Sequence, residues 1–98
     1  MKPHSFHPAA NEEYAEAARY DARLDPELGR RFYDQIERLI LDIRREPQQF
    51  PLFDPPIRRH FDSVFPYAVL YMDQPGRVLV VAVMHMKRRP GYWRDRLR

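Results

Sequence analysis

One stretch in the middle of the chain, bounded by proline at both ends, constrains the fold more than any other. Asp25 is suited to cap a helix and Pro26 to occupy its first turn, while Pro47 prevents the helix from continuing. Between these limits the apolar side chains recur at three- and four-residue spacing: Leu28, Phe32, Ile36, Leu39, Ile40 and Ile43. The pattern predicts a long amphipathic helix whose apolar face must pack against a second layer.

A second helix is predicted before it, from Pro8 to about Ala22. Pro8 again suits a first turn, and Glu12 and Glu13 place negative charge near the N-terminus, where the helix dipole favours it. Most residues expected on its inner face are small: Ala10, Tyr14, Ala17, Ala18 and either Asp21 or Ala22. Because these side chains are small, we expect this helix to be able to approach a neighbouring element closely.

After the long helix the helical period ends and strand patterns follow. The proline-rich residues 50–56 predict an extended connection. Residues 57–61, 66–72 and 77–86 have the composition of strands joined by short turns, which predicts an antiparallel meander, and residues 2–6 predict a further strand at an edge. The predicted fold class is α+β: an N-terminal strand, a helical hairpin and a three-stranded antiparallel meander. We expect the helices to pack on one face of the sheet and residues 1–98 to form one domain.

The last predicted strand is apolar on both of its faces. Strict alternation would place Val78, Val80, Ala82 and Met84 on one face and Leu79, Val81, Val83 and His85 on the other. The helices can cover only one face of the sheet. For the other face the sequence leaves three alternatives: the aromatic C-terminal tail, a second copy of the chain, or a partner protein.

Several classes of site have no support in the sequence. The chain contains no cysteine, which excludes disulfides and thiolate metal sites, and a reducing cytoplasm fits best. Its four histidines lack metal-ligand spacing and no glycine-rich phosphate loop occurs, so we expect neither a metal nor another cofactor. No segment has the apolar character of a signal peptide or the length of a membrane helix. We therefore expect a cytoplasmic protein that does not enter membranes.

Positive charge is concentrated at the C-terminal end. Residues 87–98 contain six of the seventeen Lys and Arg and one acid, Asp95, which leaves eleven basic and thirteen acidic residues in the rest of the chain. This asymmetry predicts an acidic or polyanionic partner. A second basic cluster, Arg58-Arg59-His60, begins the predicted meander. Adjacent strands lie about 5 Å apart, so the two outer strands would bring both clusters within about 10 Å of each other, on a single rim.

The residues predicted to bind a target or another anion come from both clusters: Arg58, Arg59, Lys87, Arg88, Arg89, Trp93 and Arg94. Structural alternatives exist for several of the residues in these clusters. The two arginines of the first cluster can instead protect a sheet edge, and His85 can be hydrogen-bonded at a strand end. Tyr92 and Trp93 can serve as packing anchors. The arginines from Arg88 onward are the hardest to explain by structure alone.

Several short motifs follow one another in a recognisable order. They are Phe6-His7-Pro8-Ala9-Ala10 with Glu13-Tyr14, Leu28-Gly29, Phe32 to Ile43, Phe50-Pro51, Arg58-Arg59, Phe65-Pro66-Tyr67-Ala68-Val69-Leu70-Tyr71, and His85-x-x-Arg88-x-Pro90-x-Tyr92-Trp93. Each is weak alone. In this order, over nearly the whole chain, they resemble the RelE/ParE superfamily, the toxins of type II toxin–antitoxin modules that are often described as plasmid stabilisation proteins.

The resemblance implies a partner and a target. An antitoxin would wrap the toxin as an extended, partly helical segment, and the chain would act as a homo-oligomer or in a toxin–antitoxin hetero-oligomer. RelE-like toxins cut messenger RNA in the ribosome, whereas ParE-like toxins inhibit DNA gyrase. The Phe65-Pro66-Tyr67 and Pro90-x-Tyr92-Trp93 motifs look more like the ParE-like branch.

Three hypotheses follow from this resemblance. The leading one is a growth-inhibiting, ParE-like toxin that is neutralised by an antitoxin and directed at gyrase. The second is a metal-independent, RelE-like endoribonuclease, whose catalytic residues would be Arg58, Arg59, His85, Arg88 and Tyr92. The chain lacks the lysine cluster of the ribosome-dependent toxins. The third is a non-toxic relative that only binds its partner.

Overall fold

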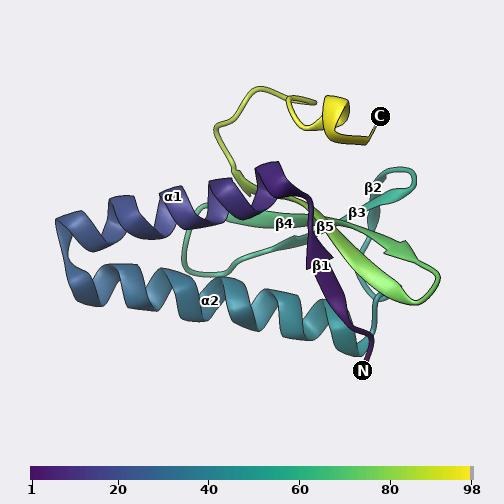
Figure 1. The fold of residues 1–98 in the computed structure, drawn as a ribbon, viewed down its shortest axis with the longest axis horizontal. Coiled ribbons are helices and arrows are strands. Elements are labelled where there is room, and N and C mark those ends of the chain that lie inside the picture. The colour runs from purple at the N-terminus through teal and green to yellow at the C-terminus, as the bar shows by residue number, and fades with distance from the viewer. Residues whose placement is uncertain (98) are drawn as a thin grey trace.

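A computed structural model describes residues 1–97, which form two α-helices and one five-stranded sheet (Figure 1). The elements are β1 (His4–Phe6), α1 (Pro8–Leu24), α2 (Pro26–Arg45), β2 (Leu52–Asp54), β3 (Ile57–Phe61), β4 (Tyr67–Gln74), β5 (Arg77–His85) and a short 3-10 helix, η1 (Arg94–Leu97). The strand order in the sheet is β1-β5-β4-β3-β2. The predicted α+β class is confirmed.

The sheet contains the predicted meander and one strand that the sequence did not indicate. β3, β4 and β5 pair antiparallel, and β1 lies parallel to β5 at one edge. At the other edge β2 pairs antiparallel with β3, inside the segment expected to be only extended. Pro51 precedes this strand, and Pro55 and Pro56 follow it. Because proline cannot donate to a strand ladder, the three prolines limit β2 to a short edge strand.

The two helices form the predicted hairpin, with only Asp25 between them. The backbone N–H of Asp25 donates to the carbonyl of Asp21 at 3.0 Å and ends α1, while its carboxylate accepts from the N–H of Glu27 at 3.0 Å and caps α2. The two helices approach each other closely at Gly29 and Ala22. A Cβ added to Gly29 would lie only 2.7 Å from the Cβ of Ala22. Within residues 1–97, neither helix combines the length and the apolar character that a membrane crossing requires.

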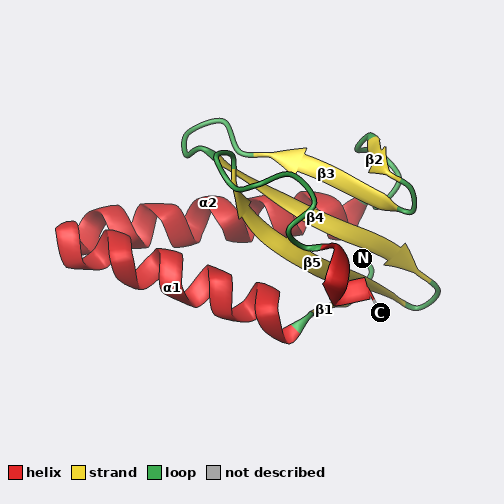
Figure 2. Ribbon diagram, turned by 90° about the horizontal axis from the view of Figure 1, so that it is seen from above, coloured by secondary structure: helices red, strands yellow, loops and turns green. Residues whose placement is uncertain are grey.

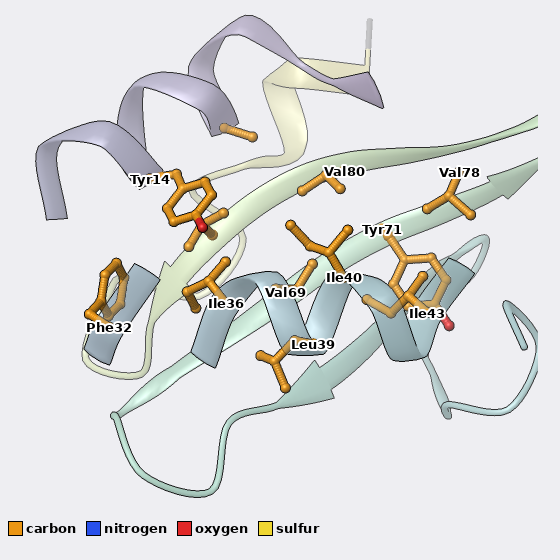
Figure 3. Packing of buried hydrophobic residues seen from close by; sticks show 12 residues of the cluster. Tyr14, Phe32, Ile36, Leu39, Ile40, Ile43, Val69, Tyr71, Val78 and Val80 are labelled. Carbon is orange, nitrogen blue, oxygen red and sulfur yellow. The ribbon is translucent and has the colours of Figure 1, made fainter. Parts of the chain in front are cut away.

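The hairpin packs on one face of the sheet, here called the near face, and forms the larger core (Figure 3). Its buried members are Ala10, Tyr14, Phe32, Ile36, Leu39, Ile40 and Ile43 from the helices and Val69, Tyr71, Val78, Val80 and Val83 from the sheet. Every residue of the predicted α2 stripe except Leu28 is buried. The amphipathic pattern therefore identified the near-face core correctly.

A β-bulge changes which residues of β5 point at the helices. The pairing of β4 with β5 shifts between Leu70 and Tyr71, so that Val81 is an extra residue on β5. Val78, Val80 and Val83 consequently pack against the helices, whereas Val81, Ala82 and Met84 pack on the opposite, far face. The predicted strict alternation along β5 is therefore correct up to Val81 and wrong from Ala82 onward.

The far face has a smaller core, closed by the C-terminal tail (residues 90–97). Trp93 is 1% exposed and packs on far-face residues of β3, β4 and β5: Ile57, Ala68, Leu70, Val81, Ala82 and Met84. Figure 2 shows the tail passing in front of β4 and β5. The chain's own tail, one of the three covers considered for this face, therefore packs on it.

Candidate functional site

The first basic cluster does not lie on one surface. In the register of β3 and β4, Arg58 lies opposite Tyr71 and Arg59 lies opposite Leu70. Because Tyr71 faces the helices and Leu70 faces the tail, the two arginines point to opposite sides of the sheet. The Arg58 guanidinium donates to the carbonyls of residues 50 and 48, at 2.8 and 3.2 Å. Arg58 therefore holds in place the segment that connects α2 to β2.

Arg59 lies on the far face between two aromatic rings. Its guanidinium carbon is 3.9 Å from the ring centroid of Phe53 and 4.5 Å from that of Phe61. Within residues 1–97, no hydrogen bond or ion pair joins this guanidinium to an acceptor. Phe53 in turn contacts Trp93, and the neighbouring Arg94 pairs with the Asp54 carboxylate at 2.9 Å. Arg59 and Arg94 are thus brought to the same side of the molecule.

The prediction that both basic clusters share a single rim is wrong. His85 and Arg88 lie beside α1 on the near side, whereas Arg59 and Arg94 lie on the far side with Trp93. The prediction used the spacing between strands but ignored the pleat within β3, which sends adjacent side chains in opposite directions. Four of the predicted residues therefore belong to two separate surfaces, and Arg58 is engaged with main-chain carbonyls.

Glu13 of α1, which the sequence analysis did not include among the site residues, organises the cluster beside α1. Its carboxylate accepts from the N–H of Val83 at 3.1 Å and from the hydroxyl of Tyr92 at 2.5 Å. The Arg96 guanidinium donates to both carboxylate oxygens, at 2.7 and 2.9 Å. Arg96 also donates to the carbonyl of Val81 at 3.0 Å, so the ion pair satisfies backbone groups of β5 beyond the end of β1.

A signal for Glu13 was present in the sequence. Glu13 follows Ala10 by three residues and precedes Ala17 by four, so it shares the predicted inner face of the helix. A carboxylate at such a position must find partners, because burying an unpaired charge is unfavourable. The side chain is 14% exposed, and the arginine-rich tail provides the partners.

Arg88 is oriented by this cluster and remains accessible. Its guanidinium lies 3.9 Å from the ring centroid of Tyr92, and its Nη1 is 3.8 Å from Oε2 of Glu13. The Arg88 side chain is 51% exposed, and Lys87 and Arg89 on either side of it are exposed. The ring of His85 accepts from the N–H of Lys87 at 3.0 Å. We call residues 87–89 the cationic segment.

A groove of about 600 Å³ runs between α1 and the end of β5, next to the cationic segment. One wall is α1, which contributes three glutamates but also Arg23: Ala9, Glu12, Glu13, Glu16, Ala17, Tyr20 and Arg23. The other wall is formed by Tyr67, Val83, His85 and Arg88. The glutamates of α1 therefore face Arg88 across an open groove.

The chemistry of this region favours binding over proton transfer. Burial raises the pKa of Tyr92, and its hydrogen bond to Glu13 raises the pKa further, so the hydroxyl stays protonated at neutral pH. Burial likewise raises the pKa of Tyr67. In residues 1–97, no group of three or more His, Cys, Asp and Glu side chains is placed to hold a metal ion. What the region offers is a set of exposed cations, of which Arg88 is oriented by Tyr92 and Glu13, and such a set suits an anionic partner.

Comparisons with known proteins agree with the fold. The sequence model of the family described as the ParE toxin of type II toxin–antitoxin systems, parDE, matches residues 5–90. A solved structure from the chromosomal ParDE toxin–antitoxin system of P. aeruginosa is similar, with a TM-score of 0.76 and 12% sequence identity. That match covers 89% of this chain and 98% of the other. None of the curated proteins matches the sequence.

Proposed function

Because the chain belongs to the ParE toxin family of type II toxin–antitoxin systems, we propose that it inhibits growth by binding DNA gyrase and that a cognate antitoxin neutralises it. The observation that carries the proposal is the family match, which spans both helices and strands β2 to β5. We further propose that residues 1–98 act as one domain in the cytoplasm, held inactive in a hetero-oligomer with the antitoxin.

The proposed contacts with the target are the exposed cations. The cationic segment is the main contact, because its three residues are exposed and Arg88, which lines the groove, is already oriented by Tyr92 and Glu13. Arg59 is proposed as a separate anion-binding residue on the far face, since it is held between Phe53 and Phe61 without an acceptor from the described chain. Arg94 and Trp93 would support that second surface.

The alternative reading, a ribosome-dependent endoribonuclease, has less support. Its candidate catalytic residues would have to converge on one phosphate, but Arg58 is bound to carbonyls on the near side and Arg59 lies on the far side. Tyr92 donates its hydroxyl to Glu13, and its raised pKa makes it a poor base near neutral pH.

The proposal is tested with purified protein in two parallel assays. We expect it to block negative supercoiling of plasmid DNA by gyrase at concentrations that leave messages in a translation extract uncut. Cleavage of messenger RNA on translating ribosomes, with gyrase unaffected, would contradict the gyrase target and support the nuclease reading.

A growth assay tests toxicity and neutralisation together. Induction of the chain alone should arrest growth, and coexpression of its cognate antitoxin should restore growth. Normal growth on induction, with the antitoxin still bound to the chain, would show a non-toxic relative that only binds its partner.

A further inference from the structure

We infer that Glu13 is a positioning residue that fixes the C-terminal tail and, through it, the cationic segment in the geometry that contacts the target. The inference rests on the proposed function, because the cationic segment is the proposed target contact. Glu13 lies on α1, about eighty residues away in sequence from the tail residues that it binds. It is therefore the link between the helical hairpin and the end of the chain.

The contacts of Glu13 explain why a carboxylate is needed at this position. Its two oxygens accept from four donor groups: the Val83 N–H, the Tyr92 hydroxyl and two nitrogens of Arg96. Hydrogen bonds to a charged acceptor are stronger than neutral ones, and the two bonds from one guanidinium fix its plane. A glutamine amide has one acceptor oxygen and would present an N–H₂ group to one of these donors.

The orientation reaches Arg88 through Tyr92. Glu13 fixes the Tyr92 hydroxyl, the Tyr92 ring lies 3.9 Å beneath the Arg88 guanidinium, and Arg88 itself is 3.8 Å from the Glu13 carboxylate. Both contacts restrain the guanidinium, while half of the Arg88 side chain remains exposed. Arg88 is therefore held ready for a partner instead of sampling its many rotamers, which reduces the entropy lost on binding.

Trp93, which also anchors the tail, cannot supply this direction. It is buried on the far face, but within residues 1–97 its indole N–H has no hydrogen-bond acceptor. Trp93 therefore contributes apolar burial, which is non-directional, whereas the bonds to Glu13 are directional. A third attachment, the exposed ion pair between Arg94 and Asp54 at 2.9 Å, lies on the far side of the molecule. The bonds to Glu13 are thus the directional contacts that lie next to Arg88.

The inference is tested with Glu13→Gln and Tyr92→Phe in the full chain. The control is Glu27→Gln, which removes a carboxylate that also pairs with an arginine, Arg30 at 2.5 Å, but on the exposed surface of α2. We measure the half-inhibitory concentration in gyrase supercoiling, growth arrest on induction, and backbone hydrogen exchange in residues 90–97 and in α2. Thermal unfolding checks that each variant folds.

We expect Glu13→Gln to raise the half-inhibitory concentration by about tenfold or more, since it weakens several charge-assisted hydrogen bonds at once. Tyr92→Phe keeps the ring under Arg88 and should raise the concentration only a few-fold. Both should speed hydrogen exchange in the tail and leave exchange in α2 unchanged. Glu27→Gln should match the unmodified chain in every assay.

Wild-type inhibition by a folded Glu13→Gln variant, or unchanged exchange in its tail, would overturn the inference. A different result would overturn the proposed function alone: no inhibition of gyrase by the unmodified chain, together with growth arrest that Glu13→Gln still weakens. Because exchange and growth arrest do not depend on which target is hit, the two failures are distinguishable.

Discussion

The two faces of the sheet are covered in very different ways. On the near face, two helices of 17 and 20 residues bury one continuous core. On the far face, a tail with a single buried side chain, Trp93, closes a smaller cluster and is attached at its polar end by Glu13. The near-face core therefore holds the fold together, whereas the proposed target contacts lie outside it: the cationic segment beside α1, and Arg59 and Arg94 on the far side.

This difference predicts that substitutions in the two regions will have separate effects on stability and on function. Substitutions in the near-face core should unfold the protein and abolish every activity together. Substitutions in the tail should loosen one end of the chain and reduce target binding while the sheet and the hairpin remain intact. The predictions below test this separation.

The largest expected effect is that of Phe32→Ala in the near-face core. Phe32 is fully buried and contacts the rings of Tyr14, Phe65 and Tyr67. Truncation leaves a cavity and should lower the free energy of unfolding by about 3–5 kcal/mol, as measured by urea denaturation. Arg31→Ala, at the exposed position beside it, is the control and should change stability by less than about 0.5 kcal/mol. A loss below 1 kcal/mol for Phe32→Ala would contradict the dominance of the near face.

A smaller loss is expected for Trp93→Ala on the far face. The side chain is as deeply buried as Phe32, but the tail can detach from the sheet and regain conformational entropy. We expect a loss of about 2–3 kcal/mol in urea denaturation, with the near-face core still formed. Complete unfolding under native conditions, as judged by the far-UV circular dichroism of the helices, would show that the two faces are not separable.

Gly29→Ala should have a moderate effect through the hairpin. The added Cβ would lie 2.7 Å from the Cβ of Ala22 and 2.8 Å from its Cα, so backbone as well as side chain must move. Alanine gains about 1 kcal/mol in helix propensity over glycine, but overpacking costs about 1–3 kcal/mol. The net loss should be about 1 kcal/mol by thermal unfolding. A gain in stability would mean that the two helices can separate at this point without loss.

The smallest effect is a pH dependence at high pH. Burial raises the pKa of Tyr71 from its usual 10.0 to about 12, and its hydroxyl donates to the carbonyl of Pro47 at 2.5 Å. Between these two values the folded chain binds more protons than the unfolded chain. Stability should therefore be constant below pH 10 and fall as the pH rises toward 12.

The comparison that isolates this effect uses two tyrosine variants. Tyr71→Phe should make the decline in the urea midpoint shallower without removing it, because burial also raises the pKa of Tyr67 and Tyr92. Tyr20→Phe, at an exposed position on α1, should leave the decline unchanged. Identical pH profiles for Tyr71→Phe and the unmodified chain would exclude a contribution of Tyr71 to the decline.

Much of the fold could be predicted from residues that act locally. Proline at positions 8, 26 and 47 and the cap at Asp25 set the helix limits, and the apolar stripe of α2 identified the core. β2 and the bulge at Val81 could not be predicted, because both depend on how a strand meets its neighbour. The opposite directions of Arg58 and Arg59 were available from strand alternation alone.

The candidate site was harder to predict than the fold. The charge asymmetry identified the C-terminal end, but the partner that organises it, Glu13, lies far away in the sequence and only the tertiary structure brings them together. The motif order gave the family correctly, because that order reflects the whole fold. The motif order did not indicate which arginines would be exposed and which would bind carbonyl or carboxylate groups of the chain itself.

The most direct test of the account compares two charge-matched triple variants in gyrase supercoiling. One replaces Lys87, Arg88 and Arg89 by serine, and the other replaces the arginines of α2 at positions 30, 31 and 38 by serine. We predict that the first variant folds but needs a concentration at least about tenfold higher for half-inhibition, whereas the second inhibits like the unmodified chain. Equal inhibition by both variants, or an equal loss of inhibition in both, would contradict the claim that the cationic segment makes the functional contact.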